Sequence, residues 1–376
     1  MYGNAKAQGS LQQEVIEQIP PHKFFLIGNA NEWMERARSK PIQKKLVGDL
    51  WYENEATVMF AETNAGKSIF AVQIADAISR GVGIGPLEFT SEAQPVVYFD
   101  FELNDRQFSI RYTIDGQNPY VWDDNFIRVE LDPDAEYPMG NYCQYVCDQI
   151  ETVMLEVNAR AAIIDNITYL NDELEKSKAA LPLMKQLKVI KQRNNFSFLI
   201  LAHTPKRPAS KPLTKNDLQG SKMIMNFVDS AFVIGESCQG PDIRYIKQLK
   251  IRNAMTKYDK ANVLVMRIEK PSNFLQFTCT GTASEMDHLE HPEPVTREKL
   301  IETVKTEYPK GKSARDIAKT LGISHTTVNR MITELDEAGE LKKRGKWNIP
   351  DATTVPGVPE CSTPTKDKEV ETLELL

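Results

Sequence analysis

The chain has 376 residues, enough for two or three domains, and its hydrophobic content of 41% is ordinary for a globular protein. No apolar run approaches the length of a membrane span, and the polar amino-terminal stretch lacks the basic-then-apolar order of a secretory signal. The five cysteines show no zinc-ligand spacing, and the net charge of −6 does not indicate a chain that is basic as a whole. We therefore expect a cytoplasmic protein without a membrane partner, in which any contact with nucleic acid depends on local basic patches.

Buried strands and amphipathic helices are predicted to alternate between residues 46 and 280, after a polar lead-in, 1–45, with a short helix at 33–38. Strands are predicted at 57–60, 96–101, 126–131, 161–165, 196–202, 231–234, 245–250 and 263–268. Helices are predicted at 68–80, 104–114, 142–158, 181–193 and 221–227. This alternation is typical of an α/β domain with a mostly parallel sheet and helices on both faces, and the last strands would extend one edge as antiparallel hairpins.

A phosphate-binding loop connects the first core strand to the first long helix. Strand, tight loop and helix are the context that a Gly-Lys-Ser motif needs, because backbone N–H groups and the positive end of the helix cradle phosphate oxygens. Lys67 can reach the β- and γ-phosphates, and the Ser68 hydroxyl can ligate Mg²⁺. The motif usually opens with Gly, and the sequence departs from it here with Ala61, whose side chain is also small. The motif predicts a site for ATP and Mg²⁺ formed by Ala61, Glu62, Thr63, Asn64, Ala65, Gly66, Lys67 and Ser68.

Polar side chains stand at the carboxyl ends of three predicted strands, where ligands of parallel sheets bind. Glu102 can polarise the water that attacks the γ-phosphate, or it can cap the next helix. Asp165 suits the acid that holds Mg²⁺ through water beside Ser68, or it is a carboxylate in a strand-end turn. His203 can contact the γ-phosphate and report its loss to the following loop, although a lone histidine is more often structural.

Together these motifs resemble the RecA-like ATPases, and among them the RadA/RepA-type AAA branch, which is related to the DnaB-like hexameric helicases. The resemblance covers about residues 28–278 and rests on segments 61–68, 96–103, 161–166, 200–206, 219–221 and 229–231. It implies a RecA-like P-loop NTPase core. It also implies that the glutamate after the second strand, Glu102, is the catalytic base, and so favours Glu102 over Asp165 for that role.

The segment Leu-Lys-Ile-Arg-Asn at 249–253 resembles the Lys-x-Arg element of hexameric helicases. In that family the two cations reach the γ-phosphate held by the neighbouring subunit, where a cation stabilises the charge of the transition state. On a strand Lys250 and Arg252 would point to the same side and could face one phosphate, or they could be solvated strand residues. If the resemblance holds, the active unit is a homo-oligomer, either a ring or a filament.

The loop at 204–218 carries four basic residues and a single acid, Asp217. In RecA-like proteins the loop after this strand faces the central channel and holds single-stranded DNA. The loop has no aromatic residue, so contact with the DNA backbone rather than base stacking is expected; the alternative is a solvated surface loop. The predicted single-strand contacts are Lys206, Arg207, Lys211 and Lys215.

A polar linker, 281–295, is predicted to precede a small helical domain at 296–349. Residues 312–332 read as helix-turn-helix, with Ser313 and Ser324 as N-caps and Gly322 in the turn. The apolar spine would consist of Ile317, Leu321, Val328 and Ile332, which leaves polar residues of the second helix to meet base edges.

Residues 340–349 look like a β-wing, so that the domain as a whole resembles a winged helix. Winged helices bind duplex DNA, and some dock proteins instead. The predicted duplex contacts are His325, Thr326, Asn329, Arg330, Arg344 and Lys346. The remaining acidic segment, 350–376, is predicted to be disordered.

The sequence therefore predicts an ATPase coupled to DNA, with a RecA-like core and a carboxyl-terminal winged helix. The resemblance favours a replication or recombination ATPase or a ring helicase, of a kind often encoded by plasmids and mobile elements. Two alternatives remain open. One is an ATP-gated DNA-binding regulator or loader that does not unwind DNA. The other is a nucleotide-dependent scaffold whose winged helix binds protein.

Overall fold

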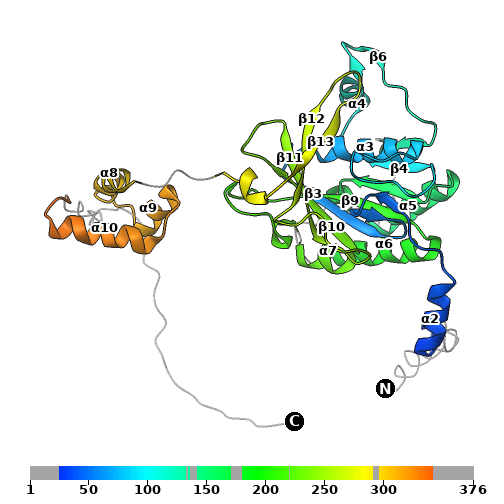
Figure 1. Cartoon of the computed structure of the whole chain (residues 1–376), viewed down its shortest axis with the longest axis horizontal. Coiled ribbons are helices and arrows are strands. Elements are labelled where there is room, and N and C mark those ends of the chain that lie inside the picture. Colours follow the sequence, from blue (N-terminus) through cyan, green and yellow to red (C-terminus); the bar gives the residue numbers. More distant parts are fainter. Residues whose placement is uncertain are drawn as a thin grey trace, which may run out of the picture. The chain divides into compact units, whose positions relative to one another are not determined.

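A nine-stranded sheet forms the centre of the first of two units in the computed structural model (Figure 1). The strand order is β13-β12-β11-β10-β3-β9-β8-β4-β7. The strands from β10 to β7 pair in parallel, and β11 to β13 extend one edge antiparallel, as predicted. The parallel strands are β3 (Ala56–Ala61), β4 (Val96–Asp100), β7 (Phe126–Val129), β8 (Ala161–Asp165), β9 (Ser197–His203) and β10 (Ser230–Glu236). The antiparallel strands are β11 (Ile243–Lys250), β12 (Val263–Glu269) and β13 (Gln276–Ala283).

The structure describes residues 25–132, 134–135, 142–170, 180–219, 221–290 and 296–341. They divide between Glu290 and His291 into a unit that contains the sheet and a carboxyl-terminal unit of helices. No helix in these ranges is both long enough and apolar enough to cross a membrane.

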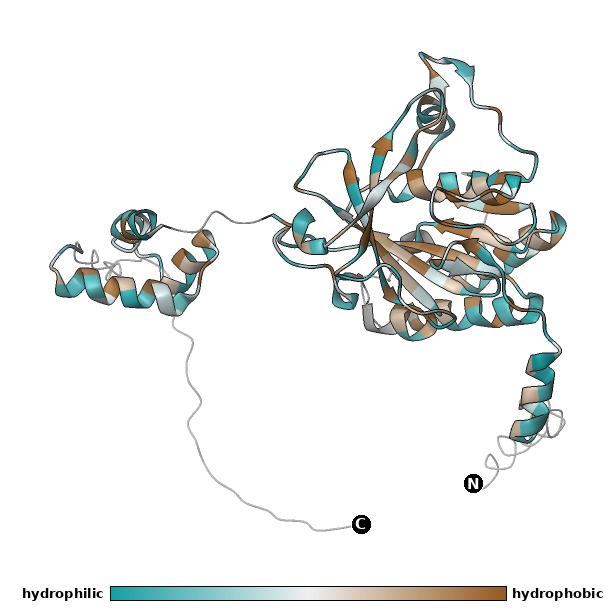
Figure 2. Ribbon diagram, in the orientation of Figure 1, coloured by the Kyte–Doolittle hydropathy of each residue, from teal (hydrophilic) through white to brown (hydrophobic). Residues whose placement is uncertain are grey.

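Helices cover both faces of the sheet, because successive residues of a strand point to opposite faces. In β3, Val58 and Phe60 pack with the helices of one face, while Met59 and Ala61 pack with those of the other. The first face carries α5 (Tyr142–Glu156), α6 (Ala180–Asn194) and α7 (Ser221–Phe227). The second carries α3 (Lys67–Arg80) and the side chain of Phe108 from α4 (Asp105–Arg111). Figure 2 shows the apolar residues concentrated on the central strands between these layers.

Shorter elements complete the sheet-containing unit. Helix α2 (Ala30–Arg38) starts earlier than predicted, because Asn29 and Glu32 form a capping box. The helix predicted for 104–114 ends at Arg111, because the next residues form a hairpin around Asp115 and Gly116, both at positive φ. The remaining short elements are β1 (Lys45–Val47), β2 (Trp51–Tyr52), β5 (Thr113–Ile114), β6 (Gln117–Pro119), η1 (Ile167–Leu170), η2 (Lys215–Asp217) and η3 (Glu285–His288).

The linker predicted for 281–295 begins too early. Strand β13, which was not predicted, continues to Ala283, and η3 then packs into the same unit through the buried side chains of Glu285 and His288. Lys247 Nζ donates to Glu285 Oε2 at 2.5 Å and to the carbonyl of Leu213 at 2.7 Å. The backbone N–H of Leu213 donates to Glu285 Oε1 at 2.8 Å. This buried ion pair anchors the end of the unit, so the core extends to Glu290. Linker residues 291–295 lie outside the described ranges.

The second unit contains the predicted helix-turn-helix. Ser313 caps α9 (Ala314–Leu321), and Gly322 ends it in the left-handed conformation at φ 66°. Ser324 then caps α10 (His325–Glu337), and α8 (Arg297–Glu307) packs against both helices. The small core includes the predicted Ile317 and Val328, with Leu321 and Ile332 half-buried beside it. The described part of the unit ends at residue 341, so Arg344, Lys346, most of the predicted wing and the tail 350–376 lie outside it, as does the lead-in segment 1–24.

The Glu285→Gln variant tests the anchoring role of the buried ion pair. It leaves the Lys247 ammonium buried without its anion, which typically costs about 3–5 kcal/mol of unfolding free energy. We expect a clear fall in Tm for this variant in thermal melts. The matched control Glu290→Gln changes an exposed carboxylate a few residues later and should leave Tm unchanged. Equal Tm values for the two variants would mean that η3 does not belong to the core.

Candidate nucleotide-binding site

The phosphate-binding loop lies at the carboxyl edge of the parallel strands. It leaves β3 at Ala61 and enters α3 at Lys67, so the positive end of a 14-residue helix faces it. Gly66 caps the helix at φ 98°, and a Cβ on this residue would lie 2.8 Å from both Ile268 Cδ1 and Phe277 Cζ. The β12–β13 hairpin therefore closes on the loop, and only glycine fits at this position.

Lys67 is buried, at 6% exposure, although its side chain makes no ion pair within the part of the chain that the structure describes. Its Nζ donates to the carbonyls of Ala61 and Glu62 at 3.2 and 3.0 Å, and it lies 3.2 Å from His203 Nδ1. Burial lowers the pKa of the ammonium, and Asp165 and Glu102 oppose that shift. Neutral groups thus hold the Lys67 ammonium beside the loop. A bound anion would stabilise this charge.

Glu102, Asn166 and His203 meet beside this lysine, each just at or after the end of its strand. Asn166 Nδ2 donates to Glu102 Oε1 and lies 3.0 Å from His203 Nε2, which is 3.5 Å from the same carboxylate oxygen. The neighbouring His203 holds the pKa of Glu102 below its usual range in spite of burial. Because Lys67 can only donate, a neutral His203 accepts at Nδ1 and carries its proton on Nε2, on the side of Glu102.

Asp165 fits the predicted place for a metal-holding acid. Its side chain is fully buried, Tyr98 donates a hydrogen bond to Oδ2 at 2.7 Å, and Oδ1 has no hydrogen-bond partner among the described residues. Burial raises the pKa of Asp165 to about 6, and the Ser68 hydroxyl close by moderates that shift. An unpaired buried carboxylate oxygen next to a hydroxyl is a donor set that suits Mg²⁺.

Protein ligands alone would not complete a metal site there. No group of three or more His, Cys, Asp or Glu residues in the described ranges could hold a metal ion. Mg²⁺ commonly keeps several waters and takes further oxygens from substrate phosphates, so Ser68 and Asp165 would hold it together with a nucleotide.

A pocket of about 180 Å³ lies over the loop, and the predicted site residues that line it are Thr63, Asn64, Gly66, Lys67, Ser68, Glu102 and His203. Two of its lining residues were not among the predicted site residues: Ile69 and Arg111. Arg111 ends α4, and its Nη1 is buried without a hydrogen-bond partner in the described part of the chain. Asn166 was also missed, although it directly follows the strand-ending Asp165. Nothing in the sequence around Arg111 indicates that it turns toward the loop.

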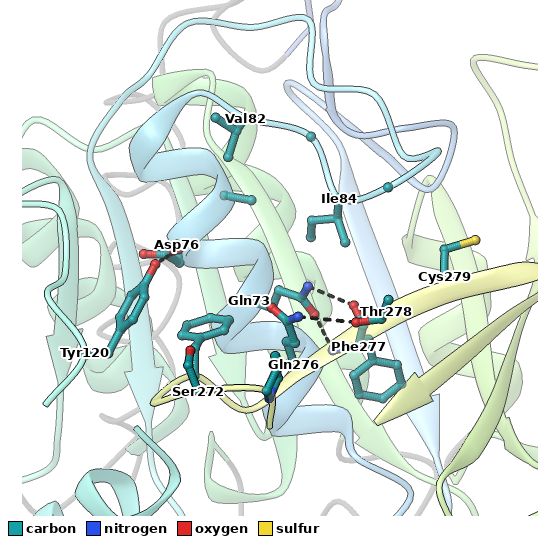
Figure 3. Close-up of a pocket in the computed structure, with 15 residues that line it drawn as sticks. Gln73, Asp76, Val82, Ile84, Tyr120, Ser272, Gln276, Phe277, Thr278 and Cys279 are labelled. Atoms are coloured by element: carbon teal, nitrogen blue, oxygen red, sulfur yellow. Dashed lines mark hydrogen bonds between the residues drawn. The ribbon is translucent and has the colours of Figure 1, made fainter. Parts of the chain in front are cut away.

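A larger hollow of about 590 Å³ lies between α3 and the β12–β13 hairpin (Figure 3). Its main polar groups already have partners in the protein: Gln73 bonds twice to the backbone of Phe277, and Asp76 pairs with Arg80 and Tyr120. The smaller pocket is lined by Lys67, which has no ion pair in the described ranges, and by Arg111, whose buried Nη1 has no hydrogen-bond partner there, so it is the better candidate site.

Lys250 and Arg252 do not share one strand as predicted. Strand β11 ends at Lys250, which pairs with Ala231 near the start of β10, so Arg252 lies beyond the strand. Lys250 Nζ donates to the carbonyls of Met225 and Val228 at 2.5 and 2.6 Å. The pairing with Ala231 places Lys250 at the amino end of β10. The phosphate loop follows the carboxyl end of the parallel strand β3, so Lys250 lies at the opposite end of these strands. Neither cation is therefore placed to reach a phosphate held by its own chain.

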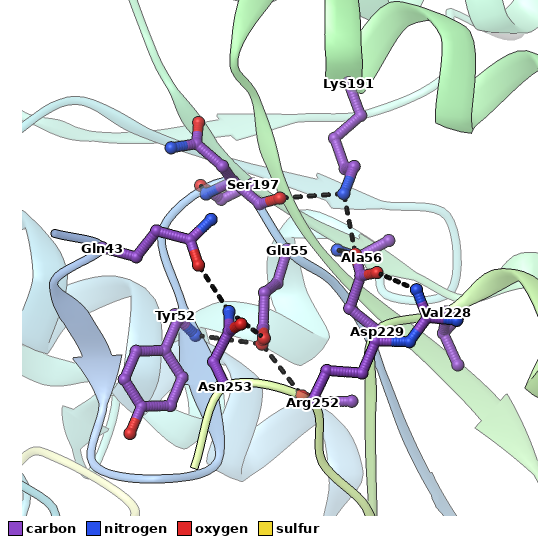
Figure 4. Close-up of polar contacts among 12 residues, drawn as sticks. Gln43, Tyr52, Glu55, Ala56, Lys191, Ser197, Val228, Asp229, Arg252 and Asn253 are labelled. Carbon is purple, nitrogen blue, oxygen red and sulfur yellow. Dashed lines mark hydrogen bonds and ion pairs between the residues drawn. The ribbon is translucent and has the colours of Figure 1, made fainter. Parts of the chain in front are cut away.

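Arg252 belongs to a polar cluster at that opposite edge (Figure 4). Its Nη1 is 3.0 Å from Asp229 Oδ1, and Asp229 Oδ2 accepts from Lys191 Nζ and from the backbone of Ala56. The Arg252 side chain is nonetheless 54% exposed. In the same cluster Glu55 accepts hydrogen bonds from Asn253 at 2.7 Å and Ser230 at 2.9 Å.

The predicted DNA contacts that lie within the described ranges are exposed with one exception. Lys206, Lys211 and Lys215 lie on the surface, whereas the Arg207 side chain is only 10% exposed and pairs with Asp217, which leaves it less accessible than the three lysines. On α10 the predicted contacts are all exposed: His325, Thr326, Asn329 and Arg330.

Two family models match the chain. Residues 30–209 match an AAA domain, and residues 295–348 match a helix-turn-helix domain. The chain carries an AAA domain followed by a helix-turn-helix domain. An AAA domain implies ATP and Mg²⁺ binding in general, and the helix-turn-helix makes an association with DNA plausible.

No curated protein matches the sequence. Among solved structures, the crystal structure of a KaiC-like protein from the hyperthermophilic archaeon Pyrococcus horikoshii OT3 is similar at 15% identity. That match covers 60% of this chain and 90% of the archaeal chain, with a TM-score of 0.42.

The buried Glu55 predicts a pH-dependent stability. Burial raises its pKa from 4.5 to about 7, so between these values the folded chain binds more protons than the unfolded chain, and stability falls as pH rises through this window. Glu55→Gln removes the ionisation and should raise Tm at pH 8 by the equivalent of about 3 kcal/mol, with no gain at pH 4. The exposed Glu92→Gln serves as the control. A Glu55→Gln protein that melts below the parent at pH 8 would contradict this account.

Proposed function

We propose that the protein is a Mg²⁺-dependent ATP hydrolase that works on DNA as a homo-oligomer, in the manner of a RepA/RadA-type replication or recombination ATPase or ring helicase. The observation that supports it best is the convergence of Lys67, Glu102 and His203 on one pocket over the phosphate loop. They come from three different strand ends, so a chance grouping of polar residues is a poor explanation.

The residues divide the chemistry between binding and proton transfer. The loop N–H groups and Lys67 would bind the phosphates, and Ser68 and Asp165 would hold Mg²⁺, which would neutralise charge on the phosphate oxygens. Glu102 is ionised and takes the proton of the attacking water as general base. Asn166 and His203 hold the Glu102 carboxylate at one oxygen, which leaves the other for the water.

His203 connects phosphate occupancy to the basic loop. A γ-phosphate that binds Lys67 competes with the contact between Lys67 and His203 Nδ1. The loop begins directly after His203, and the N–H of Gln219 at its far end donates to the His203 carbonyl at 3.1 Å. Both ends of the loop are thus tied to the sensor, so binding and loss of the γ-phosphate would move Lys206, Lys211 and Lys215 together.

A neighbouring subunit is proposed to complete each site with Arg252. Arg252 lies at the amino ends of the parallel strands, away from the phosphate loop of its own chain. About half of its side chain is exposed, and its Nη1 is paired with Asp229. A guanidinium has five donors, so the free ones can contact a γ-phosphate across an interface. Lys250 is less suited to this role, because its ammonium is occupied by two backbone carbonyls.

A second candidate is an ATP-gated DNA-binding regulator or loader that does not unwind DNA. The exposed α10 of a self-contained helix-turn-helix unit favours it, because such a helix suits duplex sites rather than a single strand. Strand displacement by the ATP-bound protein separates the two: unwinding supports the helicase, and duplex binding without displacement supports the regulator.

Glu102→Gln should keep ATP binding and stop turnover, because the amide keeps the shape of the carboxylate and loses its basicity. Loss of a positioned base typically costs about 10²–10⁴-fold in rate. Phosphate release and binding of a fluorescent ATP analogue measure the two properties. Lys67→Ala, the control for a lost phosphate site, should fail in both. Should Asp165→Asn lose as much turnover while its Mg²⁺ affinity stays normal, the roles of the two acids would have to be exchanged.

Arg252→Ala should bind ATP normally and hydrolyse it about 10³–10⁵-fold more slowly, as for other finger arginines. Mixing this variant with Lys67→Ala should restore some phosphate release, because an interface of the right polarity joins an intact pocket to an intact finger. Hydrolysis by Lys250→Ala provides the comparison, because that variant removes the neighbouring cation instead of Arg252. Mixtures that co-assemble without any rescue would show that Arg252 does not act on phosphate in a neighbour.

Arg330→Glu should weaken duplex DNA binding, because it reverses a charge on the exposed face of α10. Lys299→Glu makes the same change in net charge on α8 and is the control. Fluorescence anisotropy with a labelled duplex measures the affinity. If the two variants bind the duplex alike, the helix-turn-helix is better assigned to a protein partner.

A further inference from the structure

A buried arginine lies behind the phosphate loop, outside the pocket. Arg244 is the second residue of β11 and is 7% exposed. Its Nε donates to the carbonyl of Ala65 in the loop at 3.0 Å, and its Nη1 donates to the carbonyls of Pro241 and Ile243 at 2.8 and 2.9 Å. The guanidinium therefore ties the loop to the turn that joins β10 to β11.

The positive charge of Arg244 has little compensation within the described chain. Its one carboxylate partner there, Glu236, is 3.6 Å from Nη2 and is itself 52% exposed. A buried cation surrounded by neutral carbonyls is costly to maintain without an anion. An anion bound on the other side of the loop would reduce that cost.

The contact with Ala65 also fixes the orientation of a peptide unit. In a planar trans peptide the C=O and the following N–H point in opposite directions. Arg244 holds the Ala65 carbonyl toward β11, so the N–H of Gly66 is directed to the other side of the loop, where Gly66 lines the pocket and Arg244 does not. Glycine at positive φ is the position at which a peptide flips most easily, and a flipped peptide would present an oxygen to the phosphates.

We propose that Arg244 is a positioning residue for phosphate binding: it locks the Ala65–Gly66 peptide with its N–H toward the ligand and places a positive charge behind the loop. The ligand class is a nucleoside polyphosphate, so the inference rests on the proposed nucleotide site. Arg244 comes from the antiparallel extension of the sheet, which therefore takes part in forming the phosphate cradle as well as in covering the core.

The test is MgATP binding by the full chain with Arg244→Gln and Arg244→Lys. Loss of a hydrogen bond from a charged donor predicts a Kd about 10- to 100-fold weaker for Arg244→Gln. The rate at saturating ATP should change far less, because Arg244 does not touch the reacting atoms. Arg244→Lys keeps the charge without the fork of donors and should fall between the parent and Arg244→Gln. Arg267→Gln, which removes a half-exposed arginine of β12 paired with Asp242, is the control.

A purely structural role predicts a different pattern, in which Tm of the ligand-free protein falls while Kd for MgATP stays the same. That result, for either variant, would overturn the proposal. If Arg244→Gln does not fold, Arg244→Lys decides the matter, since an unchanged Kd there is equally contradictory. Lys67→Ala distinguishes failure of the proposed nucleotide site from failure of the proposed role of Arg244. If it binds ATP like the parent, the nucleotide site itself is wrong; if it loses ATP while Arg244→Gln retains it, only the role of Arg244 fails.

Discussion

The arrangement of this protein depends on one unbalanced charge, the Lys67 ammonium buried at the mouth of the phosphate loop. Carbonyls and a histidine nitrogen hold it, and no carboxylate in the described ranges comes close enough to form an ion pair. A nearby carboxylate would neutralise the lysine and compete with phosphate. The acids of the site, Glu102 and Asp165, are instead held by Asn166 and Tyr98, respectively. Separation of the acids from the lysine keeps the loop ready for an anionic ligand.

The parallel sheet makes this separation possible. Strands β3, β9, β8 and β4 are neighbours, and each brings a different chemical group to the same edge: the loop, a histidine, an aspartate with an asparagine, and a glutamate. The antiparallel extension then closes on the loop from the other side through Phe277, Ile268 and Arg244. The opposite edge carries the Asp229 cluster, which presents Arg252 away from its own phosphate loop. The phosphate loop at the carboxyl ends of the strands and Arg252 at the amino ends form an arrangement that suits subunits stacked head to tail.

The features that the sequence predicted correctly are local ones. The phosphate loop, the strand-ending Asp165 and the caps Ser313 and Ser324 are each specified by a few adjacent residues. The features that it missed depend on segments far apart in the chain. Strand β13 lies at the edge of the sheet and is rich in small polar residues, and only its pairing with β12 reveals it. Arg111 lines the pocket from the last residue of α4, and the Arg207 side chain is largely buried by its ion pair with Asp217, from the far end of the same loop.

The central claim is that this pocket hydrolyses ATP and that each site needs a neighbour to do so. The most direct test is phosphate release from MgATP by the unmodified protein, measured as specific activity over a wide range of protein concentration. Specific activity should rise with protein concentration as subunits meet, and it should disappear when Mg²⁺ is chelated. No phosphate release at any concentration, with or without DNA, would contradict the account.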